Sequence, residues 1–176
     1  MEMKPYLLVV TGRPGAGKTS FAKALGNEMW MPVISRDQIK EGYVHTQNKS
    51  HSQLPVETNG IVNEIFFGTI MKLIEGGVSV IVEAAFQHKL WSAMLKDFTD
   101  KVNLRVFICT VEDNVAHERF LNRKSENKER EYFHGDNIAG VSTYEAPRLD
   151  VPTFFVDTTD GYVPSVKDLV KLKNLR

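Results

Sequence analysis

The sequence contains a single cysteine in 176 residues, Cys109, which stands at the end of the apolar run Val106-Phe107-Ile108-Cys109. One cysteine cannot form a disulfide within the chain, so a disulfide-stabilised secreted scaffold is excluded. An apolar setting favours a buried, unreactive thiol over a catalytic one. We therefore expect a protein of a reducing compartment that is held together by its hydrophobic core.

Net charge and long hydrophobic runs are also absent. The 22 basic residues balance 22 acidic residues, so no global attraction for nucleic acid is expected, although a local basic patch is compatible with this balance. No apolar run approaches the length of a membrane span, and the N-terminus does not resemble a signal peptide. We expect a cytoplasmic monomer or homodimer with no membrane partner.

Residues 12–19 read GRPGAGKT and fit the phosphate-loop pattern G-x-x-x-x-G-K-[ST]. The glycines allow a tight turn whose N–H groups point at phosphate oxygens, and the helix that follows adds its positive end. The alternative is a glycine-rich turn that binds nothing, but an apolar run precedes the motif and a helical pattern follows it. We therefore expect ATP and Mg²⁺ as cofactors, with Lys18 on the phosphates and the Thr19 hydroxyl on the metal. The nucleotide-binding residues expected in this loop are Gly12, Arg13, Pro14, Gly15, Ala16, Gly17, Lys18, Thr19 and Ser20.

Short apolar runs alternate with helical patterns along the rest of the chain. The expected strands are 6–11, 32–35, 78–83, 104–109 and 153–156, and the expected helices are 18–30, 57–75, 90–101, 114–128 and 166–175. This alternation predicts an α/β fold, a three-layer sandwich around a mainly parallel five-stranded sheet, formed by a single domain over residues 1–176. Right-handed crossovers would place the carboxyl ends of all the strands along one edge, where ligands bind in such sheets.

Two polar stretches interrupt the alternation. Residues 44–56 are poor in apolar side chains and contain Pro55, so we expect a loop there. Residues 124–150 begin with KSENKERE and are expected to form a second long loop. Long loops within a compact domain are often lids, and we expect a lid around residues 124–140.

Carboxylates follow two of the predicted strands. Asp37, in Ser35-Arg36-Asp37, could accept the proton of an acceptor hydroxyl or hold Mg²⁺ through water, although a residue of this kind before a short helix is also a routine helix cap. Glu83 ends the third strand, where an acid normally touches the metal's water shell or the substrate; a solvated strand end is the alternative. Phe86, close behind it, could stack on an acceptor ring or belong to the core.

Two arginines, Arg119 and Arg123, lie four residues apart and so share one face of the helix after the fourth strand. Phosphoryl transfer needs cations over the developing charge, so we expect at least one of them to act there; pairing with nearby glutamates is the alternative. The last strand leads into Asp157 and Thr158, which could contact a nucleotide base. The five histidines show no metal-ligand spacing.

These motifs, taken in chain order, resemble the small P-loop kinases that phosphorylate small molecules or polynucleotide ends. The resemblance is to predicted ATP-binding kinases of the AAA_33 type, alongside polynucleotide kinase, chloramphenicol phosphotransferase and zeta toxin. Residues 33–40, VISRDQIK, look like the family segment whose Asp is the general base, which implies this role for Asp37. Residues 116–123, AHERFLNR, look like the start of the family's lid, which implies transition-state roles for Arg119 and Arg123. The resemblance covers most of the chain and implies the strand order 2-3-1-4-5.

The chain departs from polynucleotide kinases of this type, which carry an arginine three residues after the base where this sequence has Lys40. Lysine is a point charge and cannot form a bidentate fork, which disfavours recognition of a nucleic-acid phosphate. We expect an ATP-dependent kinase that phosphorylates a hydroxyl of a small molecule such as a nucleoside, a sugar or an antibiotic-like compound. The residues expected to contact the acceptor are Arg36, Lys40, Glu83 and Phe86. A polynucleotide 5′-hydroxyl kinase and a non-enzymatic nucleotide switch remain alternatives.

Overall fold

The computed structural model describes residues 4–126, 129–134 and 144–171. Its strands are β1 (Tyr6–Gly12), β2 (Val33–Ser35), β3 (Val80–Glu83), β4 (Asn103–Thr110) and β5 (Thr153–Asp157). All neighbouring strands pair in parallel, in the order β2-β3-β1-β4-β5. The predicted sheet and the strand order implied by the resemblance are therefore both confirmed.

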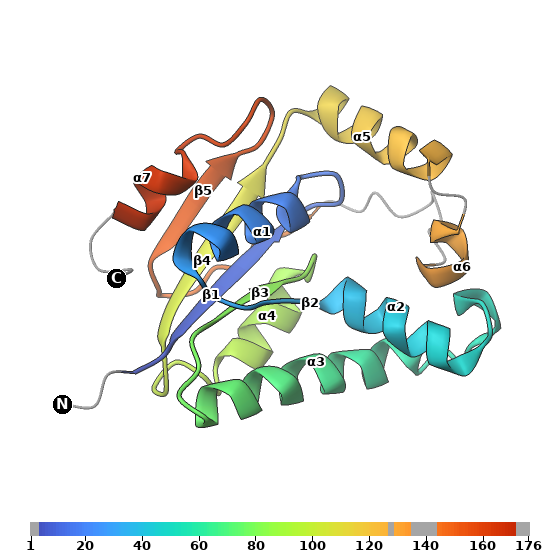
Figure 1. The fold of residues 1–176 in the computed structure, drawn as a ribbon, viewed down its shortest axis with the longest axis horizontal. Helices are drawn as coiled ribbons and strands as arrows, with labels where there is room; N and C mark the ends of the chain where they lie inside the picture. The colour runs from blue at the N-terminus through green and yellow to red at the C-terminus, as the bar shows by residue number, and fades with distance from the viewer. Residues whose placement is uncertain (1–3, 127–128, 135–143, 172–176) are drawn as a thin grey trace.

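Helices cover both faces of this sheet (Figure 1). One face carries α1 (Lys18–Met29) and α7 (Val166–Lys171), and the other carries α3 (Thr58–Glu75) and α4 (His88–Leu95). The remaining helices, α2 (Arg36–Gln47), the 3₁₀ turn η1 (His51–Gln53), α5 (Asp113–Glu126) and α6 (Arg130–His134), lie beyond the carboxyl ends of the strands. Within the described ranges, no helix is both long and apolar enough to cross a bilayer.

The two apolar layers arise from side chains that alternate along the strands. On the central strand β1, Leu7 and Val9 join the core under α3 and α4, whereas Leu8 and Val10 join the core under α1 and α7. All four are fully buried. A strand buried on both faces reads as a continuous apolar run, which is why the sequence predicted it correctly.

The expected loop at residues 44–56 is partly wrong. Helix α2 continues to Gln47, because Lys40 and Val44 lie one turn apart on its buried face and anchor it. It ends at Asn48, which has a left-handed φ of 51°, a conformation that asparagine tolerates better than most residues. Residues His51–Gln53 then form η1 rather than an irregular loop.

The second expected loop, residues 124–150, is also partly helical. Helix α5 runs through Glu126, and α6 occupies Arg130–His134 within the segment expected to be a lid. The rest of that expected lid, residues 127–128 and 135–140, lies outside the described residues. Helix α4 is shorter than the helix expected at 90–101, because the chain turns after Leu95 and buries Phe98 in the turn.

Candidate functional site

The phosphate-loop motif links β1 to α1 at the carboxyl edge of the sheet. Gly15 and Gly17 have φ values of 83° and 66°, which L-residues with side chains adopt only with strain. Gly15 also lies against α5, since a Cβ placed on it would come within 2.7 Å of the Ala116 carbonyl oxygen. The loop is therefore formed by glycine conformation and by close contact with the element that carries the two candidate arginines.

Lys18 begins α1 and folds back over the loop, where its Nζ donates to the carbonyl oxygen of Arg13 at 2.9 Å. Burial lowers the pKa of this ammonium group, and the negative charges of Glu83 and Asp37 act in the opposite direction. Arg13 itself bonds to Asp113 and to the carbonyl oxygen of Val111, which ties the loop to the start of α5. The lysine thus sits where a phosphate could replace the Arg13 carbonyl as its partner.

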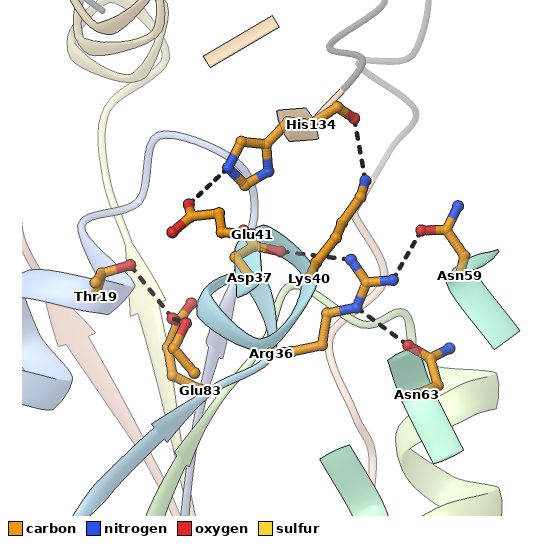
Figure 2. Close-up of polar contacts among 10 residues, drawn as sticks. Thr19, Arg36, Asp37, Lys40, Glu41, Asn59, Asn63, Glu83 and His134 are labelled. Atoms are coloured by element: carbon orange, nitrogen blue, oxygen red, sulfur yellow. Dashed lines mark hydrogen bonds and ion pairs between the residues drawn. The ribbon is translucent and has the colours of Figure 1, made fainter. Parts of the chain in front are cut away.

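Glu83 lies between the phosphate loop and β2. Its Oε2 accepts hydrogen bonds from the Ser35 hydroxyl at 2.8 Å and from the Thr19 hydroxyl at 3.3 Å, as Figure 2 shows for Thr19. Register explains the contact, because Glu83 pairs with Val10 on one side and with Ser35 on the other. Burial raises the pKa of this carboxyl, whereas Lys18 and the Ser35 bond lower it.

The hydroxyl of Thr19 and the carboxylate of Glu83 are oxygen ligands of the kind that Mg²⁺ prefers. Among the described residues no group of three or more His, Cys, Asp or Glu side chains could hold a metal by itself. Mg²⁺ usually binds through one or two carboxylates together with substrate phosphates and water, so a small donor set beside a phosphate loop suits it. The residues present therefore fit the expected ion.

Asp37 occupies the first turn of α2, half-exposed at the same edge of the sheet. Ser35 is the residue before this helix, and its hydroxyl bonds to Glu83 rather than capping the helix. Asp37 is the second helical residue, so the capping alternative does not account for it. An acidic side chain in the first turn of a helix interacts favourably with the helix dipole.

Arg36 turns from the start of α2 toward α3. Its Nε and Nη2 donate to the side-chain oxygens of Asn63 and Asn59 at 3.1 and 2.8 Å, and its Nη1 lies 3.5 Å from Asp37 Oδ1 (Figure 2). Burial lowers the pKa of the guanidinium group, and Asp37 opposes this effect. The sequence missed Asn59 and Asn63, although their spacing of four residues on one helical face was a usable signal.

The two candidate arginines of α5 have different hydrogen-bond partners. Arg119 donates to the Thr158 hydroxyl at 3.3 Å and to the carbonyl oxygens of Thr158 and Thr159 at 2.7 and 3.1 Å. Arg123 donates through Nε to the Arg119 carbonyl oxygen at 3.2 Å, and its charge lowers the pKa of Lys18. Both arginines therefore lie on the phosphate-loop side of α5, with Arg119 bound to the end of β5.

The residues that follow β5 contact the phosphate loop through a buried hydroxyl group. The Thr158 hydroxyl is buried and lies 3.1 Å from both the Ala16 and the Thr110 carbonyl oxygens. Asp157 is exposed, and the backbone N–H of Thr159 bonds to its carboxylate and lowers its pKa. The Thr158 hydroxyl is therefore placed to fix the phosphate loop, whereas the Asp157 carboxylate is exposed to solvent.

Two expected acceptor contacts have other partners in the structure. The Lys40 Nζ is buried and donates to the His134 carbonyl oxygen at 3.1 Å, so it binds α6; the His134 ring lies 2.8 Å from Glu41 (Figure 2). Phe86 packs its ring against three aromatic side chains, Phe66, Phe67 and Trp91, as the core alternative anticipated.

A polar chain at the root of the phosphate loop was not anticipated. The Trp91 indole donates to the Thr11 hydroxyl at 2.9 Å, and the Tyr144 hydroxyl lies 2.8 Å from the same oxygen. Burial raises the pKa of Tyr144 to about 12, so the phenol stays protonated. No local sequence pattern marks this contact, because 133 residues separate Thr11 from Tyr144.

Comparison with known proteins supports a kinase-like arrangement. A family model described as Zeta toxin matches residues 1–141; no curated protein matches the chain. The fold is similar to a candidate kinase from Chloroflexus aurantiacus, with a TM-score of 0.82, 23% identity and 96% of each chain covered. It is also similar to a sugar kinase from Janibacter (TM-score 0.66, 15% identity, 96% and 93% covered). A third similar structure is the APS kinase of Mycobacterium tuberculosis in complex with AMPPNP and APS (TM-score 0.67, 14% identity, 97% and 98% covered). At these identities the likeness is one of fold.

Proposed function

Because the chain belongs to the zeta toxin family and has a kinase-like P-loop fold, we propose that it transfers the γ-phosphate of ATP to a hydroxyl group of a small molecule. The observation that carries the proposal is the convergence of Lys18, Glu83 and Asp37 at one edge of the sheet. Glu83 accepts a hydrogen bond from the hydroxyl of Thr19, the residue after Lys18, at 3.3 Å. It also accepts one from the hydroxyl of Ser35, two residues before Asp37, at 2.8 Å. Burial lowers the pKa of Lys18, and the charges of both carboxylates act against that effect. Such convergence of a phosphate-binding cation with a half-exposed carboxylate suits phosphoryl transfer.

Each residue has a role in this proposal. The backbone N–H groups of residues 12–19 other than Pro14 and the Lys18 ammonium bind the phosphates, and the Thr19 hydroxyl and the Glu83 carboxylate would hold Mg²⁺. The metal supplies charge neutralisation on the phosphate oxygens. Arg119 and Arg123 offset the negative charge that develops during transfer. Positioning and electrostatics supply most of the catalysis in this chemistry.

Asp37 orients the acceptor hydroxyl and takes its proton. The hydroxyl oxygen forms a bond to the γ-phosphorus, the bond from that phosphorus to the β–γ bridging oxygen breaks, and ADP leaves. The proton passes to the Asp37 carboxylate, which lies at the solvent-accessible edge and can release it. A carboxylate within hydrogen-bond reach of the hydroxyl can accept a proton in this way without an additional base.

The test is the variant Asp37→Asn. The control is Asp97→Asn, which removes one exposed negative charge just after the end of α4. Labelled ATP should first be screened against nucleosides, sugars, antibiotics and oligonucleotides to find the acceptor. We expect Asp37→Asn to lower transfer by about 10²- to 10⁴-fold with ATP affinity little changed, and Asp97→Asn to behave as wild type. Unchanged transfer in Asp37→Asn would refute the assignment of the base.

The screen also separates the two alternatives. A polynucleotide 5′-hydroxyl kinase would phosphorylate oligonucleotides, with binding that weakens steeply as salt is added. A nucleotide switch would bind ATP but phosphorylate none of these compounds.

A further inference from the structure

Arg36 and the two asparagines beside it, Asn59 and Asn63, form a polar cluster, here called the Arg36 cluster, that adjoins the proposed base Asp37 but has no role in the proposed transfer step. We propose that it binds an anionic oxygen group of the acceptor, so that the molecule phosphorylated carries a carboxylate or phosphate close to its reactive hydroxyl. The inference rests on the proposed function, because it takes the hydroxyl next to Asp37 as the one that reacts.

The first support is the position of the guanidinium group. Its Nη1 lies 3.5 Å from Asp37 Oδ1 at the start of α2 (Figure 2). An acceptor whose hydroxyl contacts Asp37 therefore has its neighbouring atoms next to Arg36. Hydrogen bonds from a guanidinium group are stronger to a charged carboxylate or phosphate than to a neutral hydroxyl.

The second support is the way in which the cluster is assembled. Arginine only donates, so Asn59 and Asn63 must turn their side-chain oxygens toward it, at 2.8 and 3.1 Å. Their Nδ2 groups then face away from the guanidinium and add further donors. Asn59 is exposed and Asn63 half-buried. A cluster that presents donors is complementary to anionic oxygens.

The third support is charge. The Arg36 side chain is only 11% exposed, and its contacts with the asparagines are with neutral amides. Among the described residues the ion-pair partner of Arg36 is Asp37, which is itself half-exposed and lies at 3.5 Å. One half-exposed carboxylate therefore accompanies this largely buried cation. An acceptor anion would add a second negative charge beside the guanidinium group, and would do so only in the complex.

A purely structural role is the competing explanation, since Arg36 also joins α2 to α3. The two roles differ in what they predict for binding. A purely structural contact affects the affinity for every acceptor alike. An anion-binding group instead gives charged acceptors a higher affinity than neutral acceptors of the same shape.

The experiment measures binding by calorimetry with the protein saturated with Mg²⁺ and AMPPNP, so that the phosphate loop is filled. The probes are D-gluconate, D-sorbitol 6-phosphate and neutral D-sorbitol, which share a six-carbon polyol chain. We expect at least one charged probe to bind about tenfold or more tightly than sorbitol. A preference for gluconate identifies a carboxylate as the group bound, and a preference for the phosphate ester identifies a phosphate.

The variants are Arg36→Gln, which should remove the preference, and Arg36→Lys, which should retain part of it because the charge remains. Lys101→Gln removes a charge at the opposite edge of the sheet, before β4, and should leave the preference unchanged. Asn59→Ala keeps the guanidinium group and loses one tether, so it should weaken the preference even if Arg36→Gln does not fold. Equal binding of all three probes, absence of binding, or a preference that survives in Arg36→Gln would overturn the inference. Because AMPPNP is not cleaved in this assay, the result is independent of whether Asp37→Asn abolishes transfer.

Discussion

Gly15 offers a quantitative test of how the phosphate loop is held. Its φ is 83°, and a Cβ there would lie 2.7 Å from the Ala116 carbonyl oxygen and 3.2 Å from the Ala116 Cα. Gly77 has a similar φ of 75°, but a Cβ there would have no neighbour within 4 Å. Replacing each glycine by alanine therefore imposes nearly the same backbone strain, while only Gly15→Ala also adds a clash with backbone atoms.

The expected magnitudes follow from these two components. A left-handed conformation costs an alanine roughly 1–2 kcal/mol, and this is the whole effect expected for Gly77→Ala. Forcing a methyl group against a packed backbone adds about 1–3 kcal/mol, because the atoms that it meets cannot rotate away. Gly15→Ala should therefore lose about 2–5 kcal/mol of unfolding free energy in total. For a chain of this size each kcal/mol corresponds to about 2–4 °C in Tm.

Urea unfolding followed by circular dichroism would measure the difference between the two variants directly. The relaxed loop of Gly15→Ala should also bind ATP more weakly, whereas Gly77→Ala should bind it as wild type does, since Gly77 lies between α3 and β3 at the other end of the sheet. Equal loss of stability in the two variants would show that the loop does not depend on its contact with α5. A stable Gly15→Ala protein with normal ATP affinity would refute the reasoning altogether.

Two further predictions concern buried groups near this loop. Thr158→Val keeps the shape of the side chain but removes the hydroxyl that lies 3.1 Å from the Ala16 and Thr110 carbonyl oxygens. The variant should lose about 1–3 kcal/mol of unfolding free energy in urea and should bind ATP more weakly. Unchanged stability would mean that water replaces the hydroxyl. Burial raises the pKa of Cys109 from 9.0 to about 12, so the native thiol should react far more slowly with iodoacetamide at pH 8 than the thiol unfolded in guanidinium chloride. Between these two pKa values the native thiol holds its proton and the unfolded thiol does not, so this group lowers the free energy of unfolding as pH rises above about 9. Equal alkylation rates in the native and unfolded states would show that the native thiol is accessible.

Much of the fold could be predicted from local patterns. The run at β1 is apolar throughout because both faces of the central strand are covered, and the helix from Thr58 to Glu75 matches its expected bounds within one residue. The loop expected at 44–56 was partly wrong because Lys40 and Val44 contribute to a buried face of α2 that polar neighbours conceal in the sequence. Helix ends that depend on tertiary burial are poorly marked by local composition.

The candidate site likewise contains residues that could be predicted from the sequence and contacts that could not. The phosphate loop, Asp37 and Glu83 could be proposed from motifs, because strand ends and glycine spacing are local features. The partners of Arg36 and Lys40 could not, because they come from α3 and α6 and depend on how these helices pack. The core packing of Phe86 likewise follows from neighbours on α3 and α4.

By itself, the sequence determined that this chain builds a phosphate loop between a buried strand and a helix, since backbone conformation and side-chain periodicity are written in consecutive residues. Only the tertiary structure decided which side chains share the site. It brings Glu83 to Thr19 through strand register, directs Lys40 away to His134, and sets Arg36 between Asp37 and the asparagines of α3. The physical reason is that hydrogen bonds and charges act over a few ångströms, and distances of that size between remote residues are set by packing.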